Sequence, residues 1–171
     1  MPAWPRGDRS APARSIGRRC MSGRRFTLDS NILVYAVDRS AGQRHLVAEA
    51  LIMHAAERDC RLTLPAVSEF YAAVTRKRIV PARDAAMIAA DWMELFPCAA
   101  ASAEAVRLAL DAAATGRAAY WDALLVACAA EAGCAAFLTE DLADGGILFG
   151  VRIVNPFAPG GVAAAEVLGG G

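Results

Sequence analysis

The sequence predicts an α/β protein in which helices cover both faces of a parallel sheet. Short apolar runs, bounded by turn residues, alternate with longer stretches whose apolar residues recur at three- and four-residue steps. Alternation of this kind is typical of strands that form one parallel sheet. With 171 residues and a hydrophobic fraction of 56%, the chain is long enough for one well-buried domain and short for two.

Each expected strand is a short apolar run that ends at a polar residue, a proline or a turn. The expected strands are, in chain order, 26–29, 62–64, 98–101, 135–138 and 151–154. Each expected helix is a longer stretch with apolar residues on one side. The expected helices are 32–37, 43–58, 67–77, 83–95, 102–116 and 122–132.

Several residues mark where these helices begin, and two helices show an apolar side. Ser30 and Asn31 are expected to cap the first helix, and Ser102 the fifth. Pro65 is expected to end the second strand, which places Glu69 in the first turn of the third helix. The apolar side expected for the second helix consists of Leu46, Ala50, Leu51 and His54. The one expected for the last helix, which ends before Gly133, consists of Leu124, Leu125, Cys128 and Ala132.

Both ends of the chain differ in composition from the folded domain, which is expected over 25–158. Residues 1–24 hold Pro, Gly, Ser and Arg without an apolar period, so we expect a disordered, arginine-rich extension. This segment also resembles an organelle transit peptide, and a third interpretation is that Met21 is the true start. The tail 159–171, which ends in three glycines, is expected to be flexible.

Charge divides the chain into a basic N-terminus and an acidic body. Residues 1–25 hold seven of the 18 Lys and Arg residues and one of the 18 Asp and Glu residues. The remainder therefore holds 18 − 7 = 11 basic and 18 − 1 = 17 acidic residues. An acidic body suits a cation site or a basic partner better than the bulk binding of nucleic acid.

Composition argues against several other classes of site. Five cysteines make an odd count with no Cys-x-x-Cys pair, so they are interpreted as small buried hydrophobes in a reducing cytosol. His45 and His54 share one Ala-rich helical stretch, which leaves little material for a histidine-based triad. No apolar run approaches the roughly 18 residues that a membrane helix needs. We therefore expect a cytoplasmic protein without a membrane segment.

Four acids are placed where the expected fold would bring them to one edge of the sheet. Asp29 ends the first strand, and Asp141 follows the fourth. Glu69 and Asp122 are expected in the first turns of helices, and in a right-handed parallel layout such turns lie at the same edge as the strand ends. Like charges this close need compensation, which Mg²⁺ or Mn²⁺ supplies through oxygen ligands. One or two such ions would activate water against a phosphodiester without a histidine or cysteine nucleophile.

Each of these acids also has a structural interpretation, as a turn residue after a strand or as a favourable charge at a helix start. Four acids at unrelated caps would not all be expected at the same edge of the sheet, so together they favour a shared site. Glu140 and Asp144 are weaker candidates, because both are interpreted as solvated turn residues.

Four motifs occur in order along the chain: LDSNILVYA at 28–36, SEF at 68–70, WDAL at 121–124 and LTEDL at 138–142. Together they resemble the PIN-domain nucleases, specifically the VapC-like toxins of type II toxin–antitoxin pairs. The sequence VNPF at 154–157 resembles one branch of that group. The similarity extends from about Phe26 to Phe157, whereas the arginine-rich N-terminus departs from the pattern.

The resemblance implies a three-layer α/β/α sandwich with a central parallel sheet and Mg²⁺- or Mn²⁺-dependent cleavage of RNA. Carried over residue by residue, the catalytic and metal-binding quartet falls on Asp29, Glu69, Asp122 and Asp141. Asp29 and Asp122 are the expected direct metal ligands. The supporting polar positions match Ser30, Asn31 and Thr139. The resemblance also implies an RNA substrate, a cognate antitoxin as partner, and a homodimer.

Two alternatives compete with this interpretation. A non-catalytic PIN scaffold that binds RNA or protein would be indicated by a missing acid, and none of the four is missing. A haloacid-dehalogenase-like phosphatase needs a second aspartate two residues after its nucleophile, but Asn31 stands two residues after Asp29.

Overall fold

The computed structural model describes residues 25–158, so the predicted extension 1–24 and tail 159–171 lie outside the described residues. The strands are β1 (Phe26–Leu28), β2 (Leu62–Thr63), β3 (Cys98–Ala99), β4 (Ala136–Leu138), β5 (Ile147–Leu148) and β6 (Val151–Val154). The helices are α1 (Ser30–Val37), the 3₁₀ turn η1 (Arg39–Ala41), α2 (Gln43–Ala55), α3 (Leu64–Arg76), α4 (Ala82–Leu95), α5 (Ala103–Ala114) and α6 (Tyr120–Glu131). Every predicted strand and helix is present, with ends that differ by up to three residues.

Four strands form the central sheet in the order β1-β4-β6-β5. β1 and β6 both pair parallel to β4, whereas β5 runs antiparallel to β6. Beside them, β2 and β3 form a parallel pair, which a bridge between Phe26 and Cys60 joins to β1. Three of the five predicted strands therefore form the parallel part of the central sheet, the other two form a separate parallel pair, and one antiparallel edge strand is added.

The sequence did not predict β5 because that strand is joined to β6 by a tight hairpin rather than by a helix. The two turn residues, Phe149 and Gly150, both have positive φ values, 51° and 79°. Turns of this kind match the twist of antiparallel strands. The strand also has only two residues, of which Ile147 is 74% exposed. It is therefore too short to show an apolar period in the sequence.

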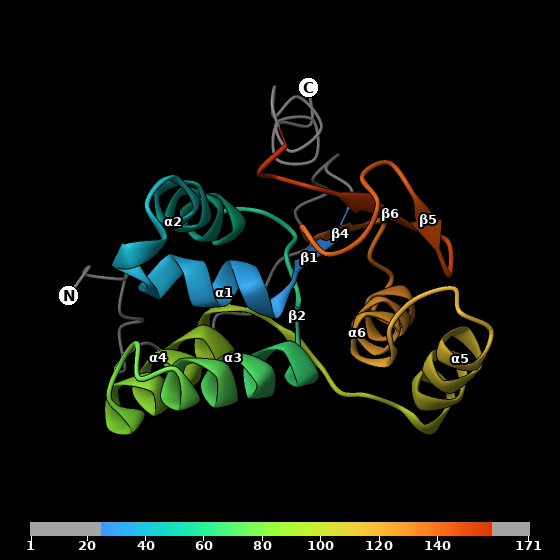
Figure 1. The fold of residues 1–171 in the computed structure, drawn as a ribbon, viewed down its shortest axis with the longest axis horizontal. Helices are drawn as coiled ribbons and strands as arrows, with labels where there is room; N and C mark the ends of the chain where they lie inside the picture. Colours follow the sequence, from blue (N-terminus) through green and yellow to red (C-terminus); the bar gives the residue numbers. More distant parts are fainter. Residues whose placement is uncertain (1–24, 159–171) are drawn as a thin grey trace, which may run out of the picture.

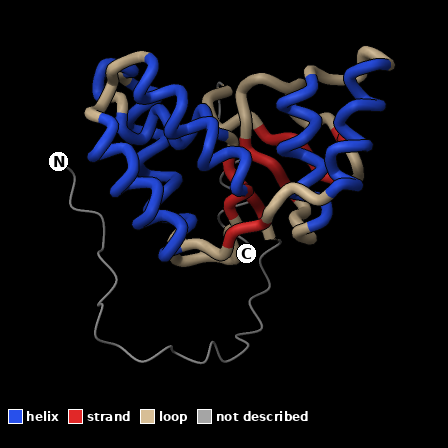
Figure 2. The backbone as a smooth tube through the Cα atoms, turned by 90° about the horizontal axis from the view of Figure 1, so that it is seen from below, coloured by secondary structure: helices blue, strands red, loops and turns tan. Residues whose placement is uncertain are grey.

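Helices cover both faces of the sheet, which confirms the predicted three-layer α/β/α arrangement. α1 to α4 lie on one side of the strands, and α5 and α6 lie on the other (Figures 1 and 2). Leu28, Phe137 and Val154, from the three parallel strands, are buried between these layers. None of the helices in residues 25–158 is long and apolar enough to cross a membrane.

α6 is buried on every side rather than along one stripe, so its predicted amphipathic character is wrong. All seven residues of Ala123–Ala129 are buried, because α6 lies between the sheet and α5 (Figure 1). α5 contributes to their interface the small side chains of Ala105, Ala109 and Ala112. The helix begins at Tyr120, two residues before the predicted start, and the prediction that Asp122 lies in its first turn is confirmed.

The predicted apolar side of α2 is also wrong, apart from Leu51. The helix ends at Ala55 and buries Ala48, Leu51, Ile52 and Ala55. Leu46 is instead 57% exposed. α2 packs mainly against the neighbouring α1, so its buried side is decided by that contact, which spacing alone did not reveal.

α3 begins three residues earlier than predicted, which moves Glu69 from the first turn to the second. Thr63 is the N-cap, and its hydroxyl oxygen accepts a hydrogen bond from the Ala66 amide at 3.3 Å. Pro65 stands in the first turn, where its missing N–H and fixed φ favour a helix start. The proline that was expected only to end the strand therefore also starts the helix.

Because Thr63 caps the helix that carries Glu69, its hydroxyl should contribute to stability. Replacing Thr63 by Val keeps the buried shape and removes the acceptor, so we expect the free energy of unfolding to fall by about 1 kcal/mol. Thr63→Ser, which keeps the acceptor, is the matched control and should lose less. Urea titrations of the three proteins measure the difference, and equal stability of parent and Thr63→Val would contradict it.

Candidate functional site

The first two predicted acids meet because β1 and β4 are parallel neighbours. Leu28 and Leu138, the last residues of the two strands, are paired in register. The Asp29 amide then donates to the Leu138 carbonyl at 3.0 Å. Asp29 and the turn that begins at Thr139 therefore leave the sheet side by side, at the edge where ligands bind in parallel α/β sheets.

Asp29 occupies the N-cap position of α1, yet its side chain makes no capping hydrogen bond. Its carboxylate accepts instead from the Thr139 hydroxyl at 2.6 Å and from the Ser30 hydroxyl at 3.2 Å. Asp29 is only 3% exposed. Burial raises the pKa of its carboxyl to about 6; the Thr139 hydrogen bond opposes this rise, and the charge of Asp141 adds to it. A structural cap would instead direct its oxygen at the helix amides.

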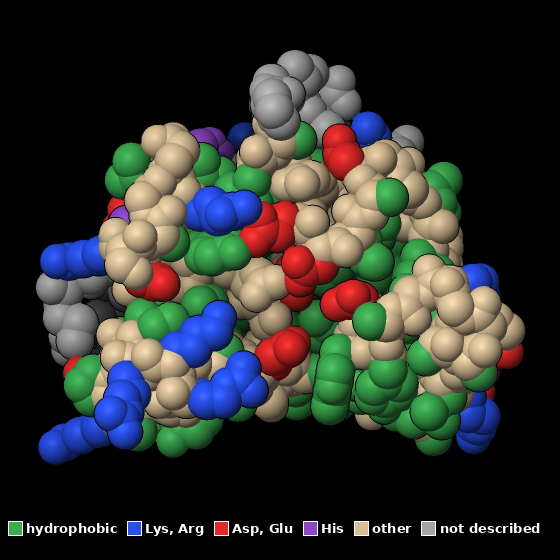
Figure 3. Space-filling view, in the orientation of Figure 1, with side chains coloured by type: hydrophobic (Ala, Val, Ile, Leu, Met, Phe, Trp, Pro, Cys, Tyr) green, Lys and Arg blue, Asp and Glu red, His purple; other side chains and the backbone are tan. Residues whose placement is uncertain are grey.

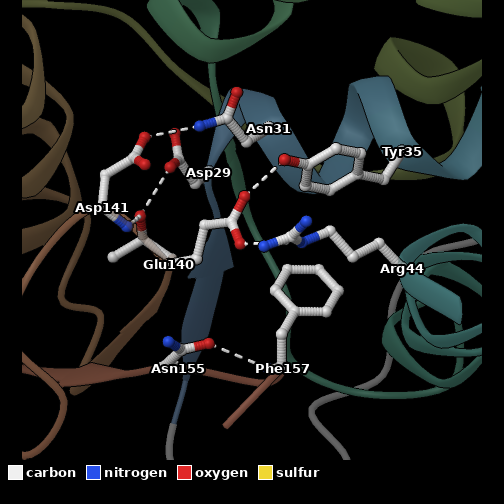
Figure 4. A network of polar contacts seen from close by, with 9 residues as sticks. Asp29, Asn31, Tyr35, Arg44, Glu140, Asp141, Asn155 and Phe157 are labelled. Carbon is white, nitrogen blue, oxygen red and sulfur yellow. Dashed lines mark hydrogen bonds and ion pairs between the residues drawn. The ribbon is translucent and has the colours of Figure 1, made fainter. Parts of the chain in front are cut away.

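Asp141 is held at the other side of the same turn. Thr139 accepts a hydrogen bond from the Asp141 amide at 3.1 Å, so one hydroxyl connects both acids. Asn31 donates from its side-chain amide to the Asp141 carboxylate, as Figure 4 shows. The predicted cap of α1 by Ser30 and Asn31 is therefore wrong, because both side chains bind carboxylates.

Asp122 and Glu69 approach from the two layers of helices. Burial raises the pKa of the Asp122 carboxyl, and the nearby charges of Asp141 and then Glu69 raise it further. The pKa of Asp141 is likewise raised by burial and by the adjacent Glu140, whereas the Asn31 hydrogen bond lowers it. Asp122 also contributes to the raised pKa of Asp29. Asp29, Asp122 and Asp141 therefore lie within electrostatic reach of one another, and Glu69 lies within reach of Asp122.

Figure 3 shows Asp and Glu side chains in a row down the middle of one face. Among residues 25–158, no group of three or more His, Cys, Asp or Glu side chains is arranged to hold a metal ion by itself. Mg²⁺ keeps several waters in most protein sites and takes one or two carboxylates, so a site of that kind does not need three acids around one point.

Glu140 is not the solvated turn residue that was predicted. Its side chain is 15% exposed, and it accepts from Arg44 Nε at 3.0 Å and from the Tyr35 hydroxyl (Figure 4). Burial and this hydrogen bond raise the pKa of Tyr35 to about 12. The sequence does not reveal this contact, because its partners are about a hundred positions apart. Tyr35 and Glu140 nevertheless each belong to one of the four motifs, LDSNILVYA and LTEDL. Asp144, the other weak candidate, accepts from the Asn155 amide at 2.9 Å.

A family comparison identifies the domain that carries this arrangement. The PIN domain model matches residues 26–143, which is more than half of the chain. The chain belongs to the PIN domain family. The match extends over the motifs that contain all four acids and Glu140.

Three solved structures share this PIN fold at low sequence identity. VapC20 from Mycobacterium tuberculosis, described as a toxin that cleaves the sarcin–ricin loop, has a TM-score of 0.54 and 15% identity over 66% of this chain and 86% of its own. VapBC2 from Rickettsia felis, bound to a DNA fragment from its promoter, has a TM-score of 0.53 and 14% identity, and the match covers 75% of this chain and 96% of the other. A toxin–antitoxin complex from Klebsiella pneumoniae has a TM-score of 0.52 and 18% identity, and the match covers 77% of this chain and 97% of the other. Likeness at this identity establishes the fold alone. No curated protein matched the chain.

The raised pKa of Asp29 predicts how stability depends on pH in metal-free protein. The folded state holds the Asp29 proton more tightly than the unfolded chain, whose carboxyl has the ordinary value of 3.8. In EDTA, the free energy of unfolding should therefore fall as pH rises from about 4 to about 6, and the part due to Asp29 is about 3 kcal/mol. Asp29→Asn, which stays neutral, should remove that part of the fall.

Urea titrations at a series of pH values measure this profile. Asp111→Asn is the control, because Asp111 is an exposed carboxylate on α5 paired with Arg117, away from the sheet edge. The interpretation of Asp29 is wrong if Asp29→Asn keeps the full pH dependence of the parent.

Proposed function

We propose that this PIN protein is a metal-dependent endoribonuclease that acts as the toxin of a toxin–antitoxin pair. The observation that supports the proposal is the group formed by Asp29, Asp122 and Asp141, whose pKa values are raised by burial and by neighbouring carboxylates, which for Asp122 include Glu69. Acids held in this way favour a cation. The folds of three toxins or toxin–antitoxin complexes support the choice of RNA and of the biological class.

The donor set fits Mg²⁺ or Mn²⁺, because carboxylate oxygens are the ligands that these hard ions prefer. We assign Asp29 and Asp122 as direct ligands, and Asp141 and Glu69 as residues that complete the site or orient water. A bound ion would lower the pKa of a water molecule and stabilise the leaving oxygen of a phosphodiester.

The remaining polar residues of the site keep the carboxylates ionised and oriented. The hydrogen bond from Thr139 lowers the pKa of Asp29 and so opposes the effect of burial, and the Ser30 hydroxyl donates to the same carboxylate. Asn31 does the same for Asp141. These neutral donors fix the carboxylates without adding a positive charge that would compete with a cation for the site.

The alternative function is a non-catalytic PIN scaffold that binds RNA or protein. Such a scaffold has no use for a carboxylate buried to 3% exposure and held by two hydroxyls, as Asp29 is. The presence of all four acids in this chain therefore favours catalysis.

We propose two protein partners for the same chain, an antitoxin and a second copy. A row of carboxylates on one face attracts a cationic segment, such as an arginine-bearing antitoxin tail. The second copy would cover some of the large exposed apolar side chains, which include Leu46, Met53, Met87 and Met93. Complexes among the similar structures support the antitoxin.

Cleavage of single-stranded RNA by the purified protein tests the enzymatic proposal. Cleavage should require Mg²⁺ or Mn²⁺ and stop with EDTA, and Asp29→Asn or Asp122→Asn should lower the rate by about a hundredfold or more. Asp111→Asn, which removes an exposed acid from α5, should cleave like the parent.

Circular dichroism of each variant shows whether it is folded. Cleavage that continues at full rate in EDTA, after repurification removes trace nucleases, would exclude a metal-dependent enzyme. A fully active Asp122→Asn variant would remove Asp122 from the assigned site.

A further inference from the structure

Arg44 is a cation held beside the row of carboxylates by contacts on two sides. It is the second residue of α2, and its Nε donates to Glu140 Oε2 at 3.0 Å. Its guanidinium carbon lies 5.6 Å from the centre of the Tyr35 ring. A planar guanidinium that both stacks and forms an ion pair is held in a fixed orientation.

The groups that hold Arg44 are themselves fixed. Tyr35 donates its hydroxyl to the other oxygen of Glu140, and its ring meets that of Phe157 edge-on at 5.5 Å. Glu140 is 15% exposed, whereas the Arg44 side chain is 55% exposed. The carboxylate is thus the anchor, and the guanidinium is the end that reaches solvent.

Only one of the three guanidinium nitrogens is engaged by the rest of the described chain. Within residues 25–158, the hydrogen bond of the Arg44 side chain is made by Nε. The two terminal nitrogens, Nη1 and Nη2, are left as a pair of donors, and such a fork matches two oxygens of a phosphate.

Arg44 also lies where a polyanion would need a cation. Glu140 is followed directly by Asp141, and Figure 4 shows Arg44, Glu140, Asp141 and Asp29 in one field. The charges of both Arg44 and Asp141 act on the Tyr35 hydroxyl. An RNA strand that meets the carboxylates is repelled by them, so a fixed cation at the end of the row would offset that repulsion.

We propose that Arg44 binds a backbone phosphate of the RNA strand that lies across the carboxylate edge, with Glu140 and Tyr35 as its positioning residues. The proposal rests on the proposed ribonuclease function and adds a substrate-binding residue to it. Contacts to phosphate fix the register of a strand and carry no sequence information. Arg44 therefore contributes to the binding of every RNA that the site accepts, whatever its sequence.

The test measures how the affinity for RNA depends on salt. The background is Asp122→Asn, which we expect to cleave at least about a hundredfold more slowly, and the probe is a fluorescein-labelled single-stranded RNA of about 20 nucleotides. Fluorescence anisotropy in Mg²⁺ at several NaCl concentrations gives the slope of log affinity against log salt. Arg44→Gln should lower that slope by about 0.7, the value for one phosphate contact to a single strand.

Two further variants separate phosphate binding from loss of a structural ion pair. Arg44→Lys keeps the charge and should keep most of the slope, with weaker affinity because the fork is lost. Arg107→Gln is the matched control, since Arg107 is a comparably exposed arginine paired with Glu104 on α5. It should leave the slope unchanged. With Asp122 intact, Arg44→Gln should raise KM about fivefold and leave kcat within about twofold.

Each result decides between the two levels of the proposal. If Arg44→Gln keeps both the slope and the KM of its parent, Arg44 is a structural residue and this inference alone is wrong. The same holds if kcat falls and KM does not change. If the unmodified chain neither binds nor cleaves RNA in Mg²⁺, the proposed function is wrong and the assignment of Arg44 is overturned with it.

Discussion

The parallel pairing of β1 with β4 is the constraint on which the rest of this structure depends. It aligns Leu28 with Leu138, so the residues that follow both strands emerge at one edge of the sheet. A single hydroxyl, that of Thr139, then donates to Asp29 and accepts from the Asp141 amide. Two acids that are more than a hundred positions apart in the chain are thereby fixed by one hydrogen-bonded turn.

This arrangement opposes the stability of the fold that makes it. Burial raises the pKa of Asp29, which means that its charged form is held at a cost in free energy. Asp122 and Asp141 are shifted in the same direction. Carboxyl groups with raised pKa values are concentrated at functional sites, where binding of another group offsets this cost in free energy. The cores on either side, with α6 buried from Ala123 to Ala129, keep the edge in place.

The sequence was sufficient to predict the three layers and the acids that follow strands. It was insufficient to predict contacts between distant parts of the chain and the start of a helix whose capping residue is ambiguous. Asp29 and Asp141 could be placed because residues after parallel strands share an edge. Glu69 was placed one turn too early, because Pro65 both ends a strand and suits a helix start. The partners of Glu140, which are Tyr35 and Arg44, belong to another layer. Only the packing of α1 and α2 against that turn brings them together.

The central claim is that the four carboxylates share one cation site, and thermal unfolding of Asp122→Asn with EDTA and with Mg²⁺ tests it most directly. Without metal, removing one charge should relieve repulsion by about 1 kcal/mol and raise the melting temperature by roughly 3 °C above that of the parent. With Mg²⁺, the difference should narrow or reverse, because the parent gains binding free energy that the variant has largely lost. If Asn at position 122 lowers the melting temperature equally in both conditions, Asp122 is a structural residue of α6 and the carboxylates do not share a site.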